Sequence, residues 1–220
     1  MNHRAALFDL DGVVFDTESQ YTDFWGSVGD KYFHSGAKFA NAIKGTTLKQ
    51  IFDKYFKDDA KLQKEITVAL DNFEMSMSYE YIEGFPEYIS RIRALGIKTA
   101  VVTSSNIKKM EKVYSAHPEF KTLFDAILTS EDFDRSKPDP DCYLKGAKRF
   151  GVEPDMCIGF EDSINGLKAV KAAGMYCVGL ATTNPHEVVA EYADLVIDNY
   201  LDYNDKERHG KYNKLIGLFV

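Results

Sequence analysis

The stretch A-A-L-F-D-L-D-G-V-V, residues 5–14, reads as a buried parallel strand whose carboxyl end carries two carboxylates, Asp9 and Asp11. Side chains two apart in a strand point to the same face, so both carboxylates should face one small volume, and Gly12 lets the backbone leave sharply. Unpaired buried charge is unfavourable, so the pair indicates a bound cation or a role in chemistry. The open alternative is a charged turn, since Asp and Gly are also common turn residues.

Composition and charge narrow the class of protein. The 220 residues can bury a sizeable core, as one domain or as a domain with a smaller insertion, and the net charge of −7 argues against nucleic acid or membrane surfaces as partners. The chain enters its first strand without a signal-peptide pattern, and no apolar run is long enough to span a bilayer. Cys142, Cys157 and Cys177 form no metal-ligand pattern and indicate buried reduced thiols. We therefore expect a cytoplasmic protein that is a monomer or at most a weak dimer.

Two patterns follow the opening strand. From Asp16 to Glu83 apolar residues recur at helical spacing, which predicts a small helical bundle whose aromatic residues form its core. From Gly84 onward short apolar strands alternate with helices, which predicts a parallel sheet covered on both faces. The expected fold class is α/β, a Rossmann-like parallel sheet covered by helices, with an inserted helical bundle. The expected domains are residues 1–16 with 84–220 for the core and residues 17–83 for the insertion.

Proline and glycine mark the ends of several predicted helices. Pro86 begins one helix and Gly96 ends it, and later helices end at Gly151 and Gly174. The predicted strands are 99–103, 126–129, 156–160, 176–180 and 195–197, and the helices between them are 107–117, 141–150, 164–173 and 186–192. The tail from Asn199 is polar until residues 215–220, which should pack back on the core.

Chemistry-bearing residues follow four of the predicted strands, at the edge where an open parallel sheet binds its ligands. After the first pair come the hydroxyls and free N–H groups of residues 103–106, which suit an anion. Two prolines stiffen the loop around Lys137, and the adjacent acids Glu161 and Asp162 suit magnesium. Taken singly, these three features could instead be a helix N-cap, a solvated lysine and a helix-capping acid.

The order and placement of these motifs resemble those of the haloacid dehalogenase superfamily of phosphotransferases. The resemblance covers nearly the whole chain, from about Ala5 to Ile197. It is carried by four motifs: Asp9-Leu10-Asp11-Gly12, Thr103-Ser104, Lys137-Pro138 and Glu161-Asp162. The inserted bundle looks like the mobile cap of that superfamily, and the nearest relatives within it are the β-phosphoglucomutase-like phosphatases.

The resemblance implies a role for each motif. Asp9 would be the nucleophile that forms an aspartyl-phosphate, while Asp11 would protonate the leaving oxygen and later deprotonate the attacking water. The implied cofactor is Mg²⁺, and the implied substrate is a small phosphorylated metabolite. The implied metal ligands are the carboxylates of Asp9 and Asp162, the backbone carbonyl of Asp11, and Glu161 as a direct or outer ligand. The implied phosphate-binding groups are Thr103, the Ser104 N–H and Lys137.

The segment Lys44-Gly45-Thr46-Thr47 interrupts the helical pattern of the insertion, so Lys44 is the expected substrate contact; an ordinary helix-to-helix turn is the alternative. The mutases that the chain resembles carry a histidine and an arginine where this chain has Tyr21 and Leu48. Their further cap lysine has no counterpart here, because no lysine lies between Lys64 and Lys98. The five histidines match no motif and are expected to be structural: His3, His34, His117, His186 and His209.

The leading hypothesis is a magnesium-dependent phosphatase that hydrolyses a small phosphate monoester, such as a sugar phosphate. A β-phosphoglucomutase-type phosphosugar mutase is one alternative, and a non-catalytic binding or regulatory protein with the same fold is another. The intact acid pair and Lys137 argue against the binding protein, since a binder needs no general acid beside a nucleophile.

Overall fold

The computed structural model describes residues 3–44, 46–201 and 215–219. The strands in these residues are β1 (Ala5–Phe8), β2 (Lys98–Val102), β3 (Ala126–Leu128), β4 (Cys157–Glu161), β5 (Tyr176–Leu180) and β6 (Leu195–Ile197). The α-helices are α1 (Glu18–Phe33), α2 (Gly36–Ile43), α3 (Leu48–Tyr55), α4 (Ala60–Ser76), α5 (Phe85–Ala94), α6 (Ile107–Ala116), α7 (Phe120–Leu123), α8 (Asp141–Phe150), α9 (Ile164–Ala172) and α10 (His186–Ala190). Two 3₁₀ turns, η1 (Ser130–Asp132) and η2 (Pro154–Met156), are also present, and residues 215–217 are helical.

The six strands form one parallel sheet in the order β3-β2-β1-β4-β5-β6. The opening strand lies at its centre, where Leu7 is aligned with Ala100 of β2 and Gly159 of β4. From β1 the chain adds β2 and β3 on one side and then β4, β5 and β6 on the other. Doubly wound sheets bind their ligands at the carboxyl ends of the strands beside such a switch point. The predicted fold class, an α/β Rossmann-like parallel sheet, is confirmed.

Helices cover both faces of the sheet, and β1 is completely buried. Phe8 packs in one apolar cluster with residues of α5, α6 and α7, whereas Leu7 packs in a second cluster with residues of α8, α9 and α10. Full burial of such a side chain contributes roughly 1.5–3 kcal/mol. This two-sided burial explains why the strand reads as a continuous apolar run rather than an alternating one.

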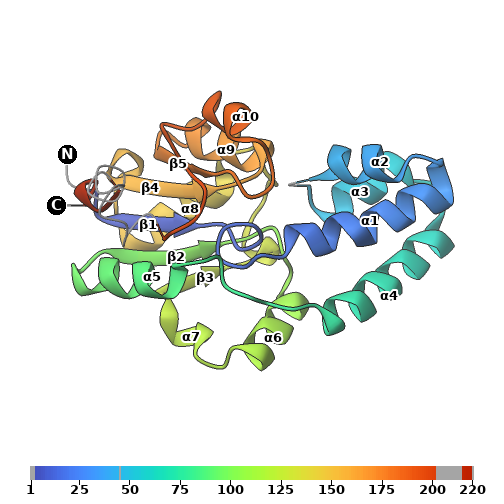
Figure 1. Ribbon diagram of the computed structural model, residues 1–220, viewed down its shortest axis with the longest axis horizontal. Coiled ribbons are helices and arrows are strands. Elements are labelled where there is room, and N and C mark those ends of the chain that lie inside the picture. The colour runs from blue at the N-terminus through green and yellow to red at the C-terminus, as the bar shows by residue number, and fades with distance from the viewer. Residues whose placement is uncertain (1–2, 45, 202–214, 220) are drawn as a thin grey trace.

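Helices α1 to α4, residues 18–76, form a helical segment that lies beyond the carboxyl ends of the strands (Figure 1). Its own apolar cluster includes Trp25, Phe39, Ile51 and Phe56. The two connections to the sheet run side by side, because Asp16 N–H donates to the Glu80 carbonyl at 2.8 Å and Ile82 N–H donates to the Val14 carbonyl at 2.9 Å. The chain therefore leaves and re-enters the sheet at one place.

Several local details differ from the sequence prediction or extend it. β4 runs one residue further than predicted, to Glu161, α10 ends earlier, at Ala190, and α7 and both 3₁₀ turns were not predicted. The tail does pack on the core in the described part, where Leu215, Ile216 and Phe219 are buried, while Val220 and His209 lie outside the described residues. The three cysteines are free and buried, as expected. Among the described helices, none combines the length and apolarity that crossing a membrane requires.

Candidate active site

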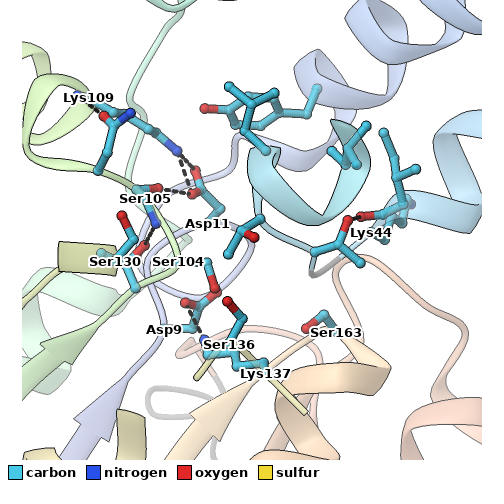
Figure 2. Close-up of a pocket in the computed structure, with 18 of the residues that line it drawn as sticks. Asp9, Asp11, Lys44, Ser104, Ser105, Lys109, Ser130, Ser136, Lys137 and Ser163 are labelled. Atoms are coloured by element: carbon cyan, nitrogen blue, oxygen red, sulfur yellow. Dashed lines mark hydrogen bonds and ion pairs between the residues drawn. The ribbon is translucent and has the colours of Figure 1, made fainter. Parts of the chain in front are cut away.

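A cavity of about 510 Å³ lies between the carboxyl ends of the strands and the helical segment. Asp9, Asp11 and Lys137 line it from the sheet side, and Lys44 lines it from the helical segment (Figure 2). Thr103, Ser104 and Asp162 also line this cavity. Within the described residues, the structure thus gathers the sequence-predicted site residues around one space, with Glu161 buried immediately beside it.

Asp9 follows directly after β1 and is fixed by two bonds. Its N–H donates to the Phe160 carbonyl at 3.0 Å, which extends the β1–β4 pairing by one residue, and its Oδ1 accepts from Lys137 Nζ at 2.8 Å. The Lys137 side chain is only 3% exposed and also donates to the Val102 carbonyl at 3.3 Å. Burial alone would lower the pKa of Lys137, but the carboxylates of Asp9 and Glu161 raise it above its ordinary value. Lys137 therefore stays a buried ammonium, and the solvated-lysine alternative is wrong.

Glu161 is completely buried and uses both of its oxygens to hold neighbours. Oε1 accepts from Lys137 Nζ at 2.5 Å and from the Tyr143 hydroxyl at 2.8 Å, while Oε2 accepts from the Asp162 N–H and the Ser163 hydroxyl, both at 3.2 Å. Helix α9 approaches so closely that a Cβ on Gly166 would lie 1.9 Å from the Glu161 carboxyl carbon. Glu161 is therefore arranged to orient Lys137 and the start of α9.

Two buried acids, Glu161 and Asp162, and the partly exposed Asp9 form a cluster that could hold a metal ion. One carboxylate oxygen each of Asp9, Glu161 and Asp162 lies within 4.8 Å of the others. Burial, together with repulsion from Glu161, raises the pKa of Asp9 to about 7 despite the opposing effect of Lys137. Burial and the nearby carboxylates of Glu18 and Glu161 raise the pKa of Asp162 well above its ordinary value. Such mutually repelling oxygen ligands fit a hard divalent cation such as Mg²⁺, which would offset their repulsion.

Asp11 lines the same cavity but points to different partners (Figure 2). Its Oδ1 accepts from the Thr17 hydroxyl and from Lys109 Nζ, both at 2.6 Å, and its Oδ2 accepts from the Ser105 hydroxyl at 3.2 Å. The strand ends at Phe8, so the alternation that predicted a shared direction for the two carboxylates does not extend to Asp11. Asp11 instead lies in the turn that Gly12 closes with a φ of +71°.

The segment after β2 combines a helix cap with a wall of the cavity. Asn106, rather than Thr103 or Ser104, caps α6, because its side chain accepts from the Lys109 N–H at 2.9 Å. The Thr103 hydroxyl is buried and accepts from the Ser105 N–H at 3.0 Å. Asn106 caps the helix and the Thr103 hydroxyl is buried, whereas Ser104 lines the cavity wall beside the Asp9 side chain.

On the opposite wall, Lys44 follows the last residue of α2. Its Nζ donates to the Thr183 carbonyl at 3.4 Å, a long bond that links the helical segment to the loop after β5. Helices α2 and α3 flank this turn as predicted, although Gly45 lies outside the described residues. The nearby Glu18 is partly buried, and its desolvation together with the Asp11 carboxylate raises its pKa to about 7.

Sequence reasoning missed Lys109, Glu18, Tyr143 and Thr183 as contributors to the site. Lys109 is one of three closely spaced lysines on α6, and nothing in their pattern shows which one is buried. Its position three residues after the Asn106 cap was the available signal, since the first turn of that helix faces the carboxyl edge of the sheet. None of the histidines within the described residues lines the cavity.

Comparisons with known proteins agree with this fold. A profile of haloacid dehalogenase-like hydrolases matches residues 3–174. Validoxylamine A 7'-phosphate phosphatase of Streptomyces hygroscopicus subsp. limoneus is 27% identical over 206 residues, covering 89% of this chain and 93% of that protein. A putative β-phosphoglucomutase from Bacteroides vulgatus superposes with a TM-score of 0.79 at 25% identity, covering 99% of this chain and 90% of that one. Protein SUPPRESSOR OF QUENCHING 1, chloroplastic, of Arabidopsis thaliana is 28% identical over 81% of this chain, which spans 18% of that longer protein.

The chain therefore belongs to the haloacid dehalogenase-like hydrolase family. It is a hydrolase whose relatives include proteins named as phosphatases.

Proposed function

We propose that this protein is a magnesium-dependent phosphatase that hydrolyses a small phosphate monoester, such as a sugar phosphate, through an aspartyl-phosphate on Asp9. The observation that carries the proposal is the buried Lys137 ammonium, 2.8 Å from Asp9 Oδ1, at the floor of a cavity on the carboxyl edge of the sheet. A fixed positive charge beside a carboxylate nucleophile can hold an incoming phosphate against charge repulsion. The similarity to a protein named as a phosphatase also supports the proposed phosphatase activity.

The reaction proceeds in two displacements at phosphorus. An Asp9 oxygen attacks the phosphorus and forms an O–P bond as the bond to the leaving oxygen breaks, and Asp11 gives that oxygen its proton. A water molecule then attacks the phosphorus and gives a proton to Asp11, and the bond to Asp9 breaks to release inorganic phosphate. Lys137, the Thr103 hydroxyl and the Ser104 N–H hold the remaining phosphoryl oxygens during both steps.

The residues present fit Mg²⁺ at the acidic cluster. The carboxylates of Asp9 and Asp162 and the backbone carbonyl of Asp11 would hold it. Glu161 would act from the outer shell, because its oxygens already accept hydrogen bonds from Lys137 and from Ser163. A bound Mg²⁺ supplies positive charge that offsets the repulsion between a carboxylate nucleophile and a phosphate group.

The helical segment acts as a cap over the cavity, with Lys44 on its substrate-facing wall. A closed cap would exclude bulk water and determine which alcohol portion fits above the phosphate. The partner that this arrangement suits is a small phosphorylated metabolite. We place the protein in the cytoplasm as a monomer.

A phosphosugar mutase is the second candidate, because a putative β-phosphoglucomutase is similar over nearly the whole chain. A mutase must hold a second phosphate group at the far end of the cavity, which requires cations there. Of the lysines that line the described cavity, Lys137, Lys109 and Lys49 are each paired with a carboxylate. Lys44 remains without an ion pair among the described residues. This reduced set of cations favours hydrolysis over transfer to a second sugar.

The test is a screen of phosphate monoesters with Mg²⁺ that follows inorganic phosphate and isomerised product in the same reactions. It should include β-glucose 1-phosphate with a trace of glucose 1,6-bisphosphate. We expect phosphate release from at least one ester, no release by Asp9→Asn, and little glucose 6-phosphate. Glucose 6-phosphate forming much faster than free phosphate would promote the mutase, and no turnover of any ester would support a binding protein.

A further inference from the structure

Lys109 is a buried cation that the proposed reaction does not yet use. Its side chain is 4% exposed, and its Nζ donates to both carboxylate oxygens of Asp11, at 2.6 Å for Oδ1. A buried ammonium is unfavourable unless it is paired, so this position is maintained by the pairing with Asp11. The other side chains that donate to the Asp11 carboxylate in the described part of the chain are those of Thr17 and Ser105, both neutral hydroxyls.

The same lysine also contacts the helical segment. Its Nζ lies 4.6 Å from the ring centre of Tyr21, a residue of α1. The Tyr21 hydroxyl donates to Glu74 of α4 at 3.0 Å, and the second oxygen of Glu74 accepts from Lys112 of α6 at 3.1 Å. Helix α6 thus connects the candidate general acid with two helices of the proposed cap.

The Asp11 carboxylate points to the side of the cavity where the leaving oxygen of the substrate would lie. Asp9 points toward Lys137, whereas Asp11 points toward Ser105 and Lys109, nearer the helical segment (Figure 2). In an in-line displacement the leaving oxygen is on the side of the phosphorus opposite the nucleophile. For attack by Asp9 that side is the cavity below the helical segment, so a general acid has to be held there.

We propose that Lys109 is the positioning residue that holds the Asp11 carboxyl on the leaving-group side of the cavity and away from Lys137. The inference rests on the proposed phosphatase function and deepens it. Without Lys109, the hydroxyls of Thr17 and Ser105 would each restrain Asp11 through a single hydrogen bond, and the buried ammonium of Lys137 beside Asp9 could attract the Asp11 carboxylate. To act as the acid, Asp11 must first take up a proton on one oxygen, so Lys109 then keeps its bond to the other oxygen only. Without that bond the protonated Asp11 would be misplaced for the transfer of its proton to the leaving oxygen.

The experiment compares two phosphate esters that differ in their need for that proton. β-Glycerol phosphate has an alkoxide leaving group that must be protonated, whereas p-nitrophenyl phosphate leaves as a stable phenolate. In K109M we expect kcat/KM to fall about 10- to 100-fold for β-glycerol phosphate and less than about threefold for p-nitrophenyl phosphate. Lys109→Arg, which keeps the charge, should recover most of the loss, and K109M should have little further effect in an Asp11→Asn background.

Lys108→Met is the matched control, because Lys108 is the preceding lysine on α6 and its exposed side chain pairs with Asp71 of α4. It should leave kcat/KM for both esters within about twofold. Activity of K109M on p-nitrophenyl phosphate also reports that the variant is folded; if it is not folded, K109Q provides the same comparison.

Equal losses on both esters, or no loss on either, would overturn the role of Lys109 while the phosphatase function stands. If the wild-type protein with Mg²⁺ releases phosphate from neither ester, the alkyl ester that the screen identifies as a substrate replaces β-glycerol phosphate in the comparison. If no ester in that screen is turned over, the proposed function fails and this inference fails with it.

Discussion

The sheet side and the helical side of the cavity are built by different means. On the sheet side, Asp9, Lys137 and Glu161 are joined by direct ion pairs, and their side chains are at most 13% exposed. On the helical side, Lys44 is half-buried and makes one long bond of 3.4 Å to a backbone carbonyl. Chemistry needs groups held to a fraction of an ångström, whereas a surface that selects among substrates can adapt. The comparison indicates that substitutions on the two sides will damage different kinetic constants.

The largest effect is expected from Asp9→Asn on the sheet side. The amide removes the nucleophile and one metal ligand with little change of shape, so turnover should fall by at least about 10³-fold. The metal-free variant should be at least as stable as the wild type, because burial disfavours the ionised Asp9 carboxyl. Phosphate release and thermal unfolding measure the two outcomes. Turnover near the wild-type level would contradict the assignment of the nucleophile.

Removing magnesium should abolish turnover, and the stabilisation that Mg²⁺ gives should depend on pH. The pKa of Asp9 is raised from 3.8 to about 7 in the folded protein, mainly by burial, and the pKa of Glu18 is also raised. A carboxyl group whose pKa is raised in this way contributes to the free energy of unfolding in full below about pH 4, and this contribution is lost as the pH rises through about 7. Because Mg²⁺ binds the ionised carboxylates, the rise in Tm on adding Mg²⁺ should be larger at pH 8 than at pH 5.

Scanning calorimetry with Mg²⁺ or with a chelator would measure this difference. Asp162→Asn is the control, since it should shrink the effect of Mg²⁺ at both pH values. An equal shift in Tm at pH 5 and pH 8 would show that the acidic cluster is not the metal site.

Lys137→Met on the sheet side should lower the free energy of unfolding much more than Lys44→Met on the helical side. It leaves the fully buried Glu161 carboxylate without its ion pair, and breaking a buried pair in this way lowers the free energy of unfolding by roughly 3–5 kcal/mol. The matched variant Lys44→Met removes a lysine that carries no ion pair among the described residues, so its effect should stay below about 1 kcal/mol. Urea unfolding of both variants makes the comparison. Similar destabilisation by both would mean that the helical side is as firmly built as the sheet side.

The smallest effect is expected from Lys44→Ala on catalysis. A contact with the substrate that is equally good in the ground state and the transition state should change KM and leave kcat nearly constant. We expect KM to rise about three- to tenfold, which corresponds to one modest contact in a solvated cavity. A fall in kcat of the same size as for the sheet-side variants would show that Lys44 acts in the chemical step.

The sequence by itself determined the architecture and the floor of the site. The apolar run before Asp9 predicted a buried parallel strand, because burial on both faces leaves no polar alternation, and the residues after later strands were expected to meet at the carboxyl edge of the sheet. Asp162 was found this way, since it follows a strand end directly, whereas Lys137 lies beyond β3 and η1 and was singled out through the motif Lys137-Pro138 and the family resemblance. The helical insertion was predicted from a different pattern, the helical spacing of apolar residues from Asp16 to Glu83.

Only the tertiary structure decided the direction of Asp11, the burial of Lys109 and the use of Glu161. Strand alternation stops at Phe8, so the orientation of Asp11 depends on a turn and on a helix more than 90 residues away in the sequence. The family resemblance left Glu161 as a direct or an outer metal ligand, and the structure adds that its oxygens accept hydrogen bonds from Lys137, Tyr143 and Ser163, the N-cap of α9. Local sequence patterns report backbone periodicity and burial. The pairing of buried charges depends on which helices pack together, and that is settled only when the whole chain has folded.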